Sequence, residues 1–315
     1  MESPQNIKKR LKSVNNIGQI TKAMELVSAT KMRKSQQIAL DSRPYAFAAL
    51  DLLANVSLIE KELPELLKHR KNIKKVLFIL VASDKGLAGS FNSSVFKKFE
   101  QHIKRDADKY ADEEKMFIAV GEKSSAYLSK KGFNIIKKFV QAGDYANPEQ
   151  VYPLADFIVD GYLEKKWDRV VIISTHFKSA LKQEPHIRRF LPIDFDHIAD
   201  AVREIVPERG KFADLIKEHG VNFVPSRNKE KDYLIEPSPE KVLTKLVRHL
   251  CFMEMYHLIL EANASEHSAR RMAMKTASDN AQDLGEALNL QYNKSRQSKI
   301  TTEISEISAG AEALN

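Results

Sequence analysis

The C-terminal part of the chain, from Pro239 onward, carries the pattern of one long helix. No proline follows Pro239, and Gly285 and Gly310 are the only glycines after it. Both residue types interrupt helices, so their scarcity favours an unbroken one. Near the end, apolar residues alternate at spacings of four and three, which is the heptad pattern of a helix that packs along another helix: Ile300, Ile304, Ile307, Ala311 and Leu314. A helix over the whole stretch would be roughly 110 Å long.

The first 60 residues predict a second long helix, with Pro4 in its first turn, an interruption or kink at Pro44 and an end at Pro64. We expect the two terminal helices to pair antiparallel, with the C-terminal heptad positions packed against those of the N-terminal helix. The apolar positions expected to form this N-terminal seam are Ile7, Leu11, Val14, Ile17, Ile20, Met24 and Val27.

The middle of the chain changes to short apolar runs that alternate with helical patterns. Strands are predicted at 76–83, 116–121, 133–140 and 169–175, and an extended segment follows to Pro192. Helices are predicted at 93–105, 122–132 and 148–165. This alternation is typical of a parallel sheet with helices on both faces.

The predicted fold class is therefore α/β: a long antiparallel coiled coil of terminal helices with an inserted, Rossmann-like α/β domain whose sheet is mostly parallel. We expect a coiled-coil helix over 1–62, the α/β domain over 74–231 and a second coiled-coil helix over 238–315. Within the domain, 194–231 reads as a charged excursion with two short helices, at 197–206 and 212–218.

Composition narrows the class of protein. Hydrophobic residues make up 43% and the net charge is +8, which fits a folded protein with an anionic partner. The first forty residues hold eight Lys or Arg and two acids. Cys251 is the only cysteine, so no intrachain disulfide is possible and a reducing compartment is expected. No apolar run reaches the roughly 18 residues that cross a bilayer, and the N-terminus lacks the apolar core of a secretory signal.

One loop has the position of a phosphate site. SDKGLAGSFN (83–92) follows the first strand and precedes a helix, but it matches neither the Walker loop nor the dinucleotide fingerprint. The favoured interpretation is therefore a tight turn with Ser90 or Asn92 capping the next helix. The histidines form no metal signature, and Asp84, Asp144 and Asp156 show no convergence on a substrate. We expect no catalytic residue, metal or cofactor.

Three blocks of the sequence resemble the gamma subunit of F-type ATP synthases, the central rotor shaft. They are IKKRLKSVNNIGQITKAMELVSATKMRKSQ (7–36), SDKGLAGSFN (83–92), and SEHSARRMAMKTASDNA through RQSKITTEISEISAGAEAL, from 265 to 314. Ala88 stands where cysteine is common in the family, and Ser90 replaces a usual glycine. The charged excursion at 194–231 is larger than in typical bacterial members.

The resemblance implies a non-catalytic rotor subunit that couples proton-driven rotation of the c-ring to ATP synthesis, or the reverse, at the beta subunits. Its partners would be the alpha and beta subunits of the head, the epsilon subunit and the c-ring, with no nucleic acid. It would be bound to the membrane only through the complex, on the cytoplasmic face of the bacterial inner membrane in preference to the mitochondrial matrix side.

The resemblance also assigns partner-binding residues. Met24 would lie near an acidic loop of the beta subunit, and Arg296, Gln297 and Thr301 would form a polar contact inside the head. Tyr233, Leu234 and Glu236 would lie at the foot, against the c-ring. Two other readings stay open from the residues alone: a coiled-coil nucleic-acid-binding protein with a hinge-like α/β domain, and an α/β enzyme that uses the 83–92 loop.

Overall fold

The computed structural model of the chain describes residues 3–59, 64–105, 114–140, 147–193 and 235–312. The chain divides into two compact units: residues 1–28 with 270–315 form the first, and residues 29–269 form the second. The predicted excursion at 194–231, with its two short helices, lies outside the described residues.

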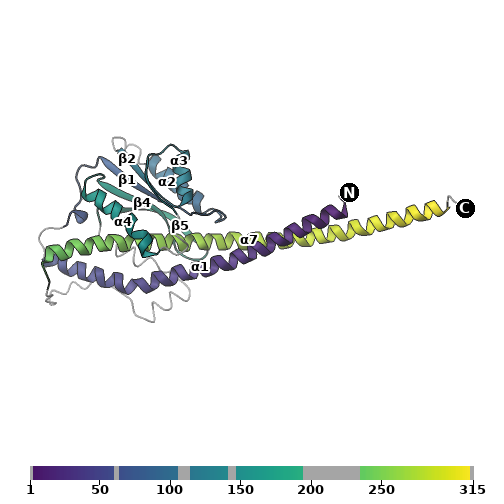
Figure 1. The fold of residues 1–315 in the computed structure, drawn as a ribbon, viewed down its shortest axis with the longest axis horizontal. Coiled ribbons are helices and arrows are strands. Elements are labelled where there is room, and N and C mark those ends of the chain that lie inside the picture. Colours follow the sequence, from purple (N-terminus) through teal and green to yellow (C-terminus); the bar gives the residue numbers. More distant parts are fainter. Residues whose placement is uncertain (1–2, 60–63, 106–113, 141–146, 194–234, 313–315) are drawn as a thin grey trace. The chain divides into compact units, whose positions relative to one another are not determined.

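The second unit is built on a five-stranded sheet with strand order β3-β2-β1-β4-β5 (Figure 1). The strands are β1 Lys75–Val81, β2 Glu114–Val120, β3 Ile135–Phe139, β4 Arg169–Phe177 and β5 Gln183–Leu191. The pairs β1–β2, β1–β4 and β2–β3 are parallel, whereas β5 runs antiparallel to β4. The mostly parallel sheet is therefore confirmed, and the segment predicted only as extended forms an antiparallel edge strand.

Helices cover both faces of this sheet, which explains why its central strands are apolar along their whole length. One face packs on α2 Phe91–Arg105 and α3 Glu122–Lys130, through a core that includes Phe78, Phe99 and Phe117. The other face packs on α4 Pro148–Leu163, on the short η1 Glu65–Leu67 and on part of the C-terminal helix.

Two long helices frame the sequence of the sheet domain. α1 spans Pro4–Ile59 and α7 spans Pro239–Glu312. α1 continues through residue 44, so the expected interruption there is absent. Ala39 and Ala49 both belong to the core around α7. Packing on both sides of Pro44 thus offsets the roughly 3 kcal/mol that a proline costs inside a helix.

In the first unit, α1 and α7 lie antiparallel, and small residues set their register. A Cβ added at Gly18 would lie 3.5 Å from Cβ of Ala281, and one added at Gly285 would lie 3.2 Å from Oδ1 of Asn15. Because α1 begins at Pro4, this register leaves the part of α7 from Ile300 to Glu312 beyond the end of α1. Figure 1 shows the last part of α7 continuing past α1.

The predicted pairing of the C-terminal heptad with the N-terminal one is therefore wrong. Ile304 is 58% exposed and Ile307 is 73% exposed, while Leu314 lies outside the described residues. The cause is that α1 and α7 approach each other closely at Ala281 and Gly285 of α7. These residues lie about five and four turns before Ile300, where the apolar heptad of α7 begins.

Candidate functional site

The side of α1 that faces α7 in the first unit differs from the predicted seam. Ile7 is buried as expected, but Ile17 is 52% exposed, and Ile20 and Val27 are also exposed. The buried or half-buried side, which we call the inner seam, keeps strict spacings of four and three. It consists of Ile7, Leu11, Val14, Gly18, Thr21, Glu25 and Ser28.

The second half of the inner seam can be polar because its side chains bond within their own helix. Thr21 Oγ1 donates to the carbonyl oxygen of Ile17 at 2.9 Å, and Ser28 Oγ donates to that of Met24 at 2.7 Å. The carboxylate of Glu25 pairs with the ammonium of Lys22 at 2.9 Å. Small and internally satisfied side chains thus let the two helices lie close, and the larger apolar side chains point elsewhere.

Those larger side chains form the candidate functional surface. A soluble protein rarely exposes so many large apolar residues unless a partner covers them. We call them the outer apolar residues, and they come from both helices of the first unit: Ile17, Ile20, Leu26, Val27, Leu284, Leu290, Ile300, Ile304 and Ile307.

The predicted polar group lies on the same exposed part of α7. Arg296, Gln297 and Thr301 are all exposed, and Thr301 Oγ1 donates to the carbonyl oxygen of Gln297 at 3.0 Å. Within the described chain Arg296 makes no ion pair, so its guanidinium is available to a partner. Met24 is half-buried on α1.

Of the three residues predicted for the foot, only Glu236 is described. It is exposed just before α7, next to Ile235, which packs on the core of the second unit. Tyr233 and Leu234 lie outside the described residues.

In the second unit the C-terminal end of β4 and the turn after it are fastened to α7 by polar contacts. The Glu261 carboxylate accepts from the backbone N–H of Phe177 at 3.2 Å and pairs with the His176 ring. One and two turns further along α7, Ser265 and Ser268 donate to the carbonyl oxygens of Thr175 and Ala180. Apolar residues of α7 between Leu243 and Ala262 also belong to the same core as the strands. The sheet and this part of α7 therefore form one packed body.

Several buried groups on α7 have shifted pKa values. Burial raises the pKa of Glu254 to about 8, although the nearby Arg188 opposes the shift. Burial also raises the pKa of the Cys251 thiol well above its usual value, and this cysteine is fully buried. A thiol of this kind is unreactive.

The loop at 83–92 is a closed turn. Ser83 N–H donates to Oδ1 of Asn92 at 3.0 Å, and Glu122 N–H donates to Oδ1 of Asp84 at 3.0 Å. Side chains at both ends of the loop are thus bound to the protein's own backbone, and they tie the loop to the end of β1 and to the start of α3. The tight turn is confirmed. Asn92 lies inside α2 and bonds back to Ser83, so it does not cap the helix. Ser90, the other expected cap, stands directly before α2, and its carbonyl oxygen accepts from the Ser94 N–H at 2.9 Å.

The other candidate chemistry stays dispersed in the parts of the chain that are described. Asp156 pairs with Arg248 at 2.9 Å, and Tyr45 Oη lies 2.8 Å from Nε2 of His249. Among those residues no cluster of three or more His, Cys, Asp or Glu could hold a metal. Nor does any helix described there combine the length and apolarity needed to span a bilayer. Asp144 lies outside the described residues.

Comparison with known proteins gives the family. A family model described as ATP synthase matches residues 3–314. The ATP synthase gamma chains of Roseiflexus castenholzii and Herpetosiphon aurantiacus are each 36% identical to this chain over its whole length, and the alignments cover 99% and 100% of those proteins.

Solved structures share the fold. The chain resembles a rotor chain of the Euglena gracilis mitochondrial ATP synthase with a TM-score of 0.56 and 17% identity, covering 94% of this chain and 98% of that one. It also resembles a chain of the Tetrahymena thermophila central stalk and c-ring structure, with a TM-score of 0.55 and 24% identity, covering 82% and 99%. Together with the curated relatives, these matches establish that the chain belongs to the ATP synthase gamma chain family.

Proposed function

We propose that this chain is the central-stalk rotor subunit of a proton-translocating F-type ATP synthase. The observation that carries the proposal is the two-helix segment of the first unit, whose inner seam is buried or half-buried while its outer apolar residues are exposed. A shaft that turns inside a sleeve of other subunits needs such a surface. The gamma-chain relatives support this assignment over the nucleic-acid-binding alternative, which nothing in the comparisons favours.

The shaft would act through unequal contacts. Near Gly18 and Ala281 a partner meets two helices, whereas at Ile304 and Ile307 it meets α7 alone. A rotating element shifts the equilibrium of a neighbouring subunit only where its contacts with two conformations differ in free energy. A segment whose cross-section and apolar surface vary in this way can favour a different conformation in each catalytic beta subunit as it turns.

Torque would enter through the second unit. Glu261, Ser265 and Ser268 tie α7 to the end of β4 and the turn after it, and the shared core adds apolar packing to these bonds. α7 then continues without a break as far as Glu312. Rotation applied to the sheet domain would therefore be passed along one continuous helix.

The partner-binding residues are proposed accordingly. Met24, Arg296, Gln297 and Thr301 would contact the alpha and beta subunits in the head. Tyr233, Leu234 and Glu236 would contact the c-ring at the foot, with the epsilon subunit bound to the α/β domain nearby. The functional divisions would be 1–62, 74–231 and 238–315, with the middle one outside the head.

The subunit itself would be non-catalytic, and the nucleotide chemistry would belong to the beta subunits. The loop at 83–92 supports this proposal, since it matches neither the Walker loop nor the dinucleotide fingerprint, and its Asp84 and Asn92 side chains bond to the backbone. As part of the complex, the chain would lie at the cytoplasmic face of the bacterial inner membrane.

Affinity purification from detergent-solubilised native membranes tests the proposal. A tag on the chain is expected to recover alpha, beta and epsilon subunits and the c-ring in one complex with ATPase activity. Recovery of the chain without alpha and beta subunits would refute the rotor assignment.

A further inference from the structure

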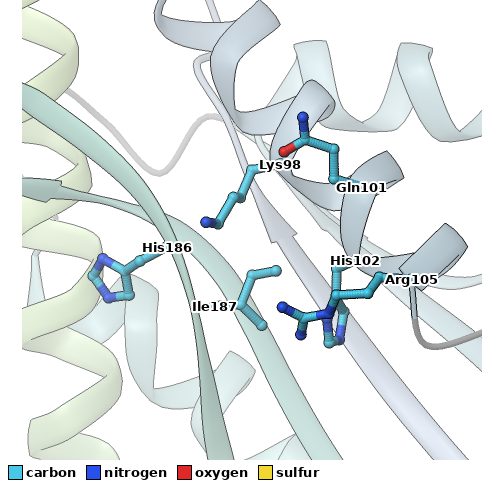
Figure 2. A pocket seen from close by; sticks show the side chains of 6 residues that line it. All are labelled: Lys98, Gln101, His102, Arg105, His186 and Ile187. Atoms are coloured by element: carbon cyan, nitrogen blue, oxygen red, sulfur yellow. The ribbon is translucent and has the colours of Figure 1, made fainter. Parts of the chain in front are cut away.

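A pocket of about 610 Å³ lies between α2 and the edge strand β5, on the face of the sheet opposite to α7 (Figure 2). This volume is within the usual range for small-molecule sites. Its lining comes from one side of α2 and the middle of β5: Lys98, Gln101, His102, Arg105, His186 and Ile187.

The α2 residues share one side of the helix because they recur at i, i+3, i+4 and i+7. Phe99, in the same stretch, is buried in the core behind them. In Figure 2 the Lys98 and Arg105 side chains extend from α2 toward Ile187 of β5. Both cations are thus presented to one cavity with an apolar floor, since Ile187 packs against the same core.

The lining carries positive charge and no carboxylate. Lys98 and Arg105 are exposed, and among the described residues Lys98 makes no ion pair. The ring of His186 points away from Lys98. Burial, Arg188 and His176 lower the pKa of His186 to about 3, so this ring is neutral at physiological pH.

The C-terminus of α2 repels anions only weakly. A helix C-terminus carries about half a negative charge, and Arg105 is the last residue of α2. Two full side-chain charges outweigh that partial charge. The guanidinium and the ammonium are also the two side-chain groups best suited to phosphate oxygens.

We propose that this pocket binds a phosphate-bearing small molecule, with Lys98 and Arg105 as the residues that hold its phosphate groups. Gln101 supplies an uncharged donor and acceptor on the same side of α2. This site is separate from the 83–92 loop and from the two-helix segment. It does not depend on the rotor function, and the isolated chain can therefore test it alone.

Isothermal titration calorimetry of the full-length isolated chain with pyrophosphate, at about 0.1 M salt, is the direct measurement. We expect saturable binding that Lys98→Gln and Arg105→Gln each weaken about tenfold, equivalent to about 1.4 kcal/mol. Lys97→Gln is the matched control, since Lys97 is an exposed lysine of α2 that does not line the pocket. It should change the affinity less than about twofold.

The source of the phosphate is resolved by further ligands. Equal affinities for ATP and tripolyphosphate would assign the pocket to phosphate groups alone, and tighter binding of ATP would assign it to a nucleotide. Binding confined to a water-soluble short-chain phosphatidylglycerol would assign it to a lipid headgroup. Absence of binding to all of these ligands would overturn the proposal. It would also be overturned if Lys97→Gln lowered the affinity as much as Lys98→Gln and Arg105→Gln do.

Discussion

Gly18 of α1 faces Ala281 of α7 so closely that a Cβ at position 18 would lie 3.5 Å from the alanine methyl group. That distance is an ordinary van der Waals contact. Gly18→Ala should therefore stabilise the chain, by up to about 1 kcal/mol, because alanine favours a helix interior more than glycine does. Urea unfolding monitored by circular dichroism measures the change.

The comparison variant is Gly161→Ala in α4, where a Cβ would lie 2.0 Å from Cζ2 of Trp167. This substitution should destabilise the chain, by about 1–3 kcal/mol, because Trp167 is buried and has no room to move. Destabilisation by Gly18→Ala as well would show that the helices lie closer than described.

Two isoleucines of the two-helix segment differ strongly in burial. Ile7 is 1% exposed and Ile304 is 58% exposed. Ile7→Ala should lower the free energy of unfolding of the isolated chain by about 2–4 kcal/mol, and Ile304→Ala should change it by less than about 0.5 kcal/mol. Chemical denaturation of both variants checks this. The reverse order would mean that the C-terminal heptad, rather than the inner seam, holds the helices together.

Arg296 is expected to matter only in the assembled complex. It is exposed, so Arg296→Ala should leave the unfolding midpoint of the isolated chain unchanged. Loss of charge-assisted hydrogen bonds to a partner, worth about 1.5–3 kcal/mol, should reduce assembly or coupled ATP synthesis about tenfold or more. Reconstituted complexes measure this effect.

The matched control for Arg296 is Lys299→Ala. Lys299 is an exposed cation one turn away that pairs with Glu303 of the same helix at 3.6 Å. A general effect of positive charge would reduce activity equally in both variants, and that result would contradict a specific role for Arg296.

Glu254 should make stability depend on pH. Its folded-state pKa is raised to about 8 from 4.5, so between these values the folded chain holds a proton that the unfolded chain releases. The contribution of Glu254 to the free energy of unfolding therefore falls as pH rises from about 5 to 8. Glu254→Gln should remove that fall and should be more stable than the parent chain at pH 8 by a few kcal/mol.

Urea unfolding of both proteins at about pH 5 and pH 8 isolates this contribution, because the other titrating groups are shared. Equal slopes of stability against pH in the two proteins would show that Glu254 is ionised in the folded chain, with Arg188 as its compensating charge.

The spacing of apolar residues along the sequence predicted nearly every helix and strand that the structure describes, because buried strands and long helices leave strong local patterns. The register of α1 against α7 could not be predicted in this way. Apolar spacing pointed to Ile17 and Ile20, whereas the close approach is made at Gly18, a residue that apolar periodicity does not count.

Tertiary contacts explain the other differences. Packing of Ala39 and Ala49 keeps α1 helical through Pro44, and no local signal reports such packing. The sequence of the extended segment before Pro192 does not show whether it forms a parallel or an antiparallel strand. That direction depends on its pairing with β4. The pocket at Lys98 and Arg105 could not be predicted because it forms only where α2 packs beside β5. The spacing of the basic residues along α2 could have indicated that side of the helix.

Rotation itself tests the central claim most directly. Cys251 is fully buried, so a cysteine introduced by Lys130→Cys at the exposed end of α3 gives one accessible attachment point for a bead. With the head immobilised through its beta subunits, ATP should drive rotation of the bead in one direction. A bead that stays still while the same complexes hydrolyse ATP would contradict the rotor function.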